Sequence, residues 1–203
     1  HQVAVPPGRR AVLTVGSEVS LWQPLLLDWV MWMRRSLPDI SLRVHVDLPK
    51  DLTEQVASGL VDLAIMYAPQ HRPGLKIDLL LDEKLVLVST EPGPAAFDGR
   101  GYVYMDWGSD FELNHGMNFP DLVPEVFIDL GPLALNYVLL TGGSGYFRMS
   151  VVQPYLESGQ LHLVADMPQF AYPIYAVHHA TADASVVGPA LAGLHDVAAP
   201  KGS

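Results

Sequence analysis

The stretch from Leu13 to Tyr67 constrains the possible fold more than any other part of the sequence. Short apolar runs and amphipathic segments follow one another there in the order strand, helix, strand, helix, strand. Parallel strands need crossovers of this kind, and such crossovers are right-handed. We therefore expect the carboxyl ends of the three strands to meet at one edge, at positions 16–17, 48–49 and 67–68. Open parallel sheets bind their ligands at this edge.

The first helix of this stretch carries more apolar surface than one core face needs. Its core face is predicted from helical spacing and comprises Trp22, Leu25, Leu26, Trp29 and Met33. A second apolar group, Leu27, Met31 and Trp32, lies where solvent-facing residues are expected. We interpret this second group as an oligomer interface. The alternative is that a second lobe of the protein covers it.

The next segments predict the rest of this lobe. Residues 40–48 alternate between apolar and polar, which is typical of a strand that is at a sheet edge or half covered. Gly59 stands where a helix end favours a positive φ, and residues 61–67 are an apolar run typical of a buried central strand. Residues 84–90 predict another buried strand, and the preceding Asp82 and Glu83 are expected to be solvated charges.

After a Pro- and Gly-rich break at residues 91–101 the α/β plan repeats. A strand at 102–105 is followed by an expected loop that contains Trp107, Phe111 and His115, and further strands and helices continue to the end of the chain. The prediction is an α/β protein of two Rossmann-like lobes with a cleft between them. The first lobe takes residues 10–91, the second takes 92–173, and 174–198 return to the first. Residues 1–9 and 199–203 resemble linker or tag sequences.

Composition excludes several classes of function. The formal charge of −10 disfavours direct contact with nucleic acid, because phosphates would be repelled. The absence of cysteine excludes disulfides, thiolate metal sites and a cysteine nucleophile. No apolar run approaches the roughly 18 residues that a membrane span needs, and residues 1–10 lack a signal-peptide pattern. We therefore expect a cytoplasmic protein without membrane contact.

Several segments together resemble the effector-binding (regulatory) domain of LysR-type transcriptional regulators, a bacterial family. They are LTVGSEVSLW from Leu13, RRSLPDISLRVHV from Arg34, LTEQVASGLVDLAIMY from Leu52, LLTGGSG from Leu139 and LESGQLHLV from Leu156. The resemblance covers roughly residues 10–198. The chain departs from the family at residues 146–148, where Tyr, Phe and Arg stand in place of small apolar residues and a proline.

The resemblance implies a fold like that of type 2 periplasmic binding proteins, with a small effector in the cleft between the lobes. It also implies a homodimer or tetramer, paired through surface helices and strands. The family's amino-terminal winged helix-turn-helix is absent from this sequence, so contact with DNA is expected only through that missing domain.

The candidate ligand-binding residues follow the strand ends of both lobes. They are Ser17, Glu18, Leu48, Pro49, Tyr67, Trp107, Gly131, Tyr146, Phe147 and Arg148. Ser17 offers a hydroxyl and backbone N–H groups at a helix start, which suit an anion, although it could instead be a helix N-cap. Arg148 could hold a carboxylate with two hydrogen bonds or form a structural ion pair with an acidic neighbour.

The sequence offers no catalytic residues. Ser144 lies in GGSGY, but a nucleophile elbow needs glycine two residues after the serine, where Tyr146 stands. His178 and His179 are adjacent in a predicted strand and point to opposite faces, so they cannot chelate one metal ion together. We expect no enzyme activity, no metal and no cofactor.

The function we predict is small-molecule sensing for a LysR-type regulator. Aromatic residues near one arginine and one serine suggest a small organic acid, aromatic or otherwise apolar. The alternative is a periplasmic-type solute-binding protein that serves a transporter.

Overall fold

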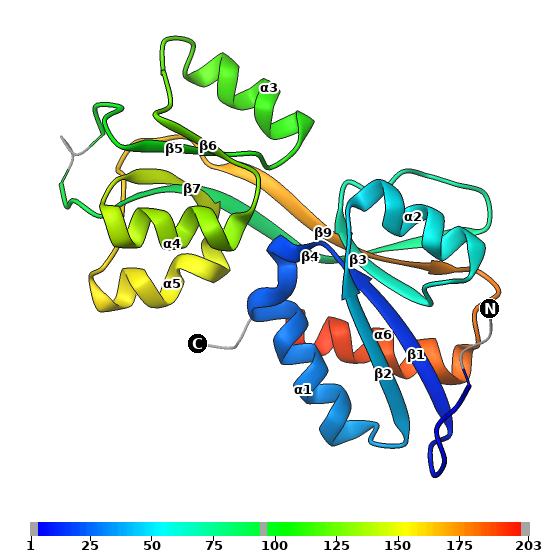
Figure 1. The fold of residues 1–203 in the computed structure, drawn as a ribbon. Helices are drawn as coiled ribbons and strands as arrows, with labels where there is room; N and C mark the ends of the chain where they lie inside the picture. Colours follow the sequence, from blue (N-terminus) through cyan, green and yellow to red (C-terminus); the bar gives the residue numbers. More distant parts are fainter. Residues whose placement is uncertain (1–3, 94–96, 200–203) are drawn as a thin grey trace. The chain divides into compact units, whose positions relative to one another are not determined.

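The computed structural model describes residues 4–93 and 97–199, which form two compact units. The first unit contains residues 1–82 and 173–203, and the second contains residues 83–172. The chain passes from one unit to the other along β4 (Leu75–Ser89) and returns along β9 (Phe170–His179) (Figure 1). The predicted end segments and the break at 91–101 fall partly on residues 1–3, 94–96 and 200–203, which lie outside the described residues.

The strands of the first unit lie in the order β2 (Ile40–Val46), β1 (Ala11–Ser17), β3 (Leu63–Tyr67) and β9. β1 lies between β2 and β3 and is parallel to both. β9 pairs with β3 in the antiparallel direction. β2 therefore ends the row β2-β1-β3-β9, which confirms that the alternating segment is an edge strand.

Helices cover both faces of this sheet (Figure 1). α2 (Pro49–Ser58) packs on one face and ends at Gly59, whose φ of 82° confirms the expected left-handed cap. α1 (Leu27–Ser36) and α6 (Ala184–Ala198) pack together on the other face. The Trp29 indole N–H donates to the carbonyl oxygen of Ala190 at 2.9 Å and ties these two helices together.

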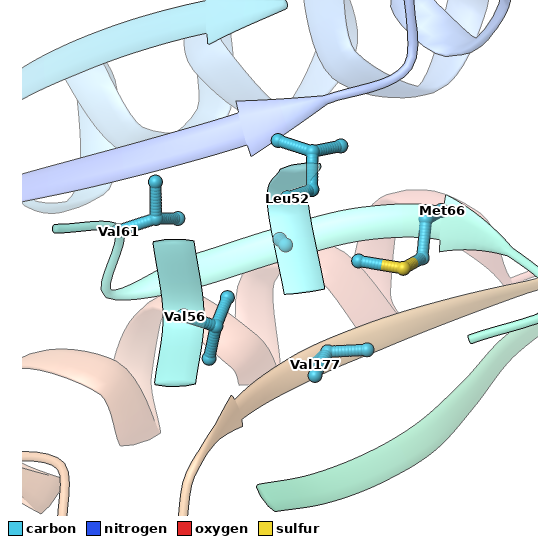
Figure 2. Packing of buried hydrophobic residues seen from close by; sticks show 6 residues of the cluster. Leu52, Val56, Val61, Met66 and Val177 are labelled. Carbon is cyan, nitrogen blue, oxygen red and sulfur yellow. The ribbon is translucent and has the colours of Figure 1, made fainter. Parts of the chain in front are cut away.

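A compact apolar cluster fixes α2 on the sheet (Figure 2). Its buried members are Leu52, Val56, Val61, Ala64, Met66 and Val177. Leu52 reaches towards β1, where Gly16 leaves room for it, since a Cβ at Gly16 would overlap the leucine side chain. This close approach places the start of α2 at the carboxyl end of β1.

The prediction for the core face of the first helix is wrong at one residue. Leu25, Leu26, Trp29 and Met33 are buried, but the Trp22 side chain is 38% exposed. The reason is local: Gln23 has φ −127° and ψ 133°, so the turn η2 (Trp22–Leu26) is not continuous with α1 in helical geometry. Helical spacing counted across this break therefore misplaces Trp22.

The second apolar group of the first helix divides between solvent and core. Leu27 and Met31 are 44% and 46% exposed. Trp32 is partly buried, because its ring lies against Gly193 of α6. Trp32 thus contributes to packing within the first unit, whereas Leu27 and Met31 remain on the surface.

The second unit repeats the α/β plan, with its strands in the order β4-β7-β5-β6 and β8 beside β4. The bounds are β5 (Tyr102–Met105), β6 (Val126–Ile128), β7 (Ser144–Arg148) and β8 (His162–Leu163). α4 (Gly131–Thr141) and α5 (Met149–Ser158) pack against β7 on one face. α3 (Ser109–Asn118) lies on the opposite face (Figure 1).

Two expectations for this half of the chain are wrong. The segment expected as a loop after Met105 contains α3, in which Phe111 and His115 occupy one buried helical face four residues apart. Glu83 is buried rather than solvated, with 6% of its surface exposed, because it lies within β4 on the same side as Leu85 and Leu87. Within residues 4–93 and 97–199, no helix has the length and apolarity to cross a membrane.

The contact between Trp32 and Gly193 allows the packing of α1 on α6 to be tested. A Cβ at position 193 would overlap the Trp32 ring, so Gly193→Ala should lower the free energy of unfolding by about 1–3 kcal/mol. Gly116→Ala is the matched control: it is also helical and its Cβ would meet open space, so it should raise stability by about 0.5–1 kcal/mol.

Urea unfolding followed by circular dichroism measures both changes. In a Trp32→Leu background the effect of Gly193→Ala should shrink, because the ring that it strikes is gone. If Gly193→Ala lowered the free energy of unfolding equally in the unaltered and Trp32→Leu backgrounds, overlap with the Trp32 ring would not be the cause of the loss.

Candidate functional site

The carboxyl ends of three strands meet at one edge of the first unit, as the sequence predicts. In the parallel registers, Ser17 at the end of β1 lies opposite Val46 of β2 and Ile65 of β3. The Asp47 N–H donates to the carbonyl oxygen of Ser17 at 3.1 Å, so the pairing continues to the last residue of the strand. Five of the predicted ligand-binding residues (Ser17, Glu18, Leu48, Pro49 and Tyr67) follow these three strand ends.

Ser17 is fully buried at this edge. Its hydroxyl donates to the carbonyl oxygen of Glu18 at 3.0 Å, a bond within the turn itself. The residue at the N-cap of the short helix η1 (Val19–Leu21) is Glu18, and its side chain makes no capping bond. The hydroxyl of Ser17 therefore stabilises the strand end, and a direct role in ligand binding stays a prediction.

Glu18 connects two of the strand ends. Its Oε1 accepts a hydrogen bond from the Tyr67 backbone N–H at 2.8 Å, and its own N–H donates to the carbonyl oxygen of Ile65 at 3.3 Å. The carboxylate thus holds the end of β3 beside the end of β1. It also places a negative charge at the edge where a ligand is expected.

The third part of this edge is the start of α2. Pro49 is its first residue, a position where the missing N–H is harmless, and the preceding Leu48 is 68% exposed. Asp47 accepts hydrogen bonds from the Leu48 N–H and the Gln55 amide, each at 2.9 Å, and these bonds lower the pKa of its carboxyl group. The backbone N–H groups of the first turn give this end of the helix a partial positive charge.

Three of the predicted residues of the second unit also lie at strand ends, whereas Tyr146 and Phe147 lie inside β7 (Ser144–Arg148). Trp107 comes after β5, Gly131 after β6, and Arg148 ends β7, and these three strands are parallel. Their carboxyl ends therefore form an edge of the second sheet, in the way that Ser17, Leu48 and Tyr67 do in the first.

Three of these residues pack into the core of the second unit. Trp107 is 4% exposed and donates its indole N–H to the carbonyl oxygen of Tyr146 at 2.9 Å. The buried Tyr146 donates its hydroxyl to the carbonyl oxygen of Pro168 at 2.8 Å, and burial raises the pKa of that hydroxyl. Phe147 is 2% exposed.

Arg148 forms the structural ion pair that the sequence left open as an alternative. The side chain is fully buried, and its guanidinium Nη2 lies 3.5 Å from Oε2 of Glu83. The Ser150 hydroxyl donates to the same carboxylate, and the backbone N–H groups of Lys84 and Ser150 approach its Oε1 at 3.2 and 3.4 Å. The charge of Arg148 is therefore balanced within the second unit. A ligand contact by this residue stays a prediction.

The structure describes no arrangement with the geometry of a catalytic site around Ser144. The serine is 3% exposed at the start of β7, and its Oγ has no hydrogen-bond partner among the described residues. No cluster of three or more histidine, aspartate or glutamate residues in ranges 4–93 and 97–199 is close enough to hold a metal ion.

Two structural roles at these edges were not predicted from the sequence: Glu18 bridges to β3, and Glu83 is the counterion of Arg148. Both roles depend on partners far away in the sequence. Strand alternation could have identified Glu83 as inward-facing, because it lies two and four residues before Leu85 and Leu87. No local sequence pattern predicts the hydrogen bond that the Tyr67 N–H donates to Glu18.

Comparison with known proteins agrees with the family that the sequence resembles. Residues 7–98 match the LysR substrate binding domain family. The chain is 23% identical over 173 residues to the HTH-type transcriptional regulator HdfR of Salmonella schwarzengrund (strain CVM19633), a match that covers 83% of the chain and 61% of the relative. The relative from Salmonella typhimurium is 22% identical over the same length. The chain thus spans about three fifths of the length of these curated relatives.

Solved structures share the fold. The regulatory domain of HypT from Salmonella typhimurium superposes with a TM-score of 0.75 at 13% identity, covering 96% of this chain and 99% of that one. The reduced OxyR regulatory domain from Pseudomonas aeruginosa gives a TM-score of 0.72 at 15% identity, covering 93% and 97%. The predicted fold class, α/β and periplasmic-binding-protein-like of type 2, is thereby confirmed.

The curated relatives are named transcriptional regulators, which agrees with the prediction that the chain is not an enzyme. The family match over residues 7–98, the curated relatives and the shared fold agree with the predicted resemblance to the effector-binding (regulatory) domain of LysR-type transcriptional regulators.

Proposed function

We propose that the carboxyl edge of the first sheet is where this domain senses its effector. The observation that carries the proposal is the family match over residues 7–98, which contains the whole of this edge. Parallel sheets offer backbone N–H groups and helix starts at such an edge. The predicted contribution of Trp107, Gly131, Tyr146, Phe147 and Arg148, and of a cleft between the lobes, remains part of the sequence-based prediction.

The ligand class that we propose is a small organic acid with an apolar body. The first turn of α2 supplies N–H donors and a partial positive charge for a carboxylate. The exposed Leu48 side chain, together with Pro49, supplies apolar surface beside it. The guanidinium of Arg148 is engaged with Glu83, so the helix start replaces it as the anchor for the acid.

A second candidate class is a ligand with a cationic or N–H donor group. It is favoured by Glu18, whose carboxylate stands at the same edge. A negative charge there would repel an acid that came close to it and attract an ammonium group. If the effector is an acid, the acidic member of a matched pair of ligands should bind, and if it is a cation, the basic member should bind.

In the intact protein the effector signal would pass to DNA through a part outside this chain. The curated relatives are longer than the chain and are named HTH-type regulators, so we place DNA binding in that additional part and the protein in the cytoplasm. A bound effector shifts the domain between arrangements only as far as its affinity for them differs. The alternative, a solute-binding protein of a transporter, lacks such a partner domain.

Calorimetric titration with benzoate and benzylamine tests the ligand class. Benzoate should bind and benzylamine should not. Leu48→Glu should weaken benzoate binding about tenfold, which corresponds to about 1.4 kcal/mol, because it adds a negative charge at the start of α2. Leu60→Glu is the control: Leu60 is also exposed but follows the other end of α2, so affinity should stay within about twofold.

Heat from benzylamine alone would establish the second class and contradict the first. Equal weakening by both glutamate variants would remove the edge from the binding site, even if benzoate binds.

We also propose that the chain forms a homodimer through the exposed apolar surface of α1. Leu27 and Met31 carry this surface, and Trp32, although packed on α6, borders it. Exposed apolar side chains on one helical face are typical of a protein interface.

Sedimentation velocity at micromolar concentration tests the dimer. The unaltered chain should sediment as a dimer, and Leu27→Ser/Met31→Ser should sediment as a monomer, because serine removes the apolar contacts. Leu60→Ser/Leu79→Ser changes two leucines of the same unit, each 52% exposed, and should leave the dimer intact. A monomeric unaltered chain would favour the transporter-type alternative.

A further inference from the structure

The second unit has a pocket of about 410 Å³ between α3 and the strands β5 and β6. This volume lies within the range of about 300–1,000 Å³ that is typical of small-molecule sites. The pocket is lined by Tyr104, Asp106, Glu112, His115, Gly116, Phe119, Leu122, Pro124 and Phe127. None of these residues belongs to the proposed effector edge of the first unit.

Aromatic rings form much of the pocket wall. The Tyr104 ring centroid lies 5.5 Å from that of Phe127 and 5.0 Å from that of His115, and the His115 and Phe119 centroids are 5.1 Å apart. The planes meet at 48°, 86° and 42°, so the rings face in different directions instead of forming one stack. Phe127 on the edge strand β6 is 70% exposed and is therefore open to a ligand.

The charges at the pocket are all negative. Asp106 and Glu112 are its acidic lining residues, and the lining includes no lysine or arginine. His115 adds no positive charge at neutral pH, because burial lowers its pKa and its Nε2 is engaged with the Tyr102 hydroxyl at 2.7 Å. Burial, with a smaller contribution from the nearby carboxylates of Asp106 and Glu112, raises the pKa of Tyr104 to about 12.

We propose that this pocket binds a small organic cation, a quaternary or methylated ammonium group, between the aromatic rings and the two carboxylates. The faces of aromatic rings are negative and attract such cations, and an ammonium group that carries methyl groups loses little hydration when it enters an apolar site. Asp106 and Glu112 add charge attraction at the rim. An anionic ligand would be repelled here, and a neutral ligand would leave the carboxylates unused.

This inference does not depend on the effector edge of the first unit. The two sites lie in different units and select ligands by different chemistry, so either can be present without the other.

Titration with choline and with 3,3-dimethyl-1-butanol tests the proposal. The two molecules have nearly the same shape, but the alcohol has a neutral carbon where choline has its ammonium nitrogen. Choline should bind with a dissociation constant at or below about 1 mM, and the neutral analogue should bind at least about tenfold more weakly. Chemical-shift changes in the second unit locate the site in the same experiment.

Variants separate the two kinds of contact. Phe127→Leu keeps an apolar side chain but removes an exposed ring, and should weaken choline binding at least about threefold. The double variant Asp106→Asn/Glu112→Gln should weaken choline binding about tenfold. Its choline affinity should also depend less on salt concentration than that of the unaltered protein. The controls are Tyr137→Leu on α4 and Glu157→Gln on α5, which change similar groups outside the pocket and should leave the affinity within about twofold.

Equal affinity for choline and its neutral analogue would overturn the proposal, and so would a lack of choline binding. Choline binding that the pocket variants leave unchanged would also overturn it, because the cation would then bind elsewhere.

Discussion

The close approach of α2 to β1 at Gly16 is the contact on which the proposed sensing edge depends. Leu52 occupies the space above Gly16 that any larger residue would fill, and it anchors the apolar cluster beneath α2. This packing sets the start of the helix at Pro49 beside the end of β1. The bond from the Tyr67 N–H to Glu18 then brings the end of β3 to the same place.

Local periodicity was sufficient to predict β1, β2, α2 and β3 of the first unit, but not the first half of β4, because only residues 84–90 were predicted as a strand there. The alternation of residues 40–48 and the apolar run of 61–67 identified an edge strand and a central strand, because side-chain burial repeats with the strand period. The wrong predictions fall where local backbone geometry, or packing against residues far away in the sequence, determines which side chains are buried. Non-helical dihedral angles at Gln23 displace Trp22 from the core face, and α3 lacks the apolar content that usually marks a helix.

The candidate site was predicted as a set of strand ends, and the structure places those residues at the carboxyl edges of the parallel strands in each unit, except Tyr146 and Phe147, which lie inside β7. Their individual roles could not be predicted, because each depends on a partner far away in the sequence. Arg148 is 65 residues from Glu83, and Trp107 is 39 residues from the carbonyl oxygen of Tyr146 that it binds. Glu83 balances the charge of Arg148, so the anion recognition that we propose for the first unit would rest on backbone donors at the start of α2.

Amide hydrogen exchange with and without a saturating organic acid tests most directly whether the carboxyl edge of the first sheet senses the effector. We expect the acid to slow amide hydrogen exchange in residues 16–18, 47–51 and 66–68, which surround the strand ends and the first turn of α2. Slower exchange confined to the amino end of β1 or to the helices of the second unit, with these three segments unchanged, would contradict it.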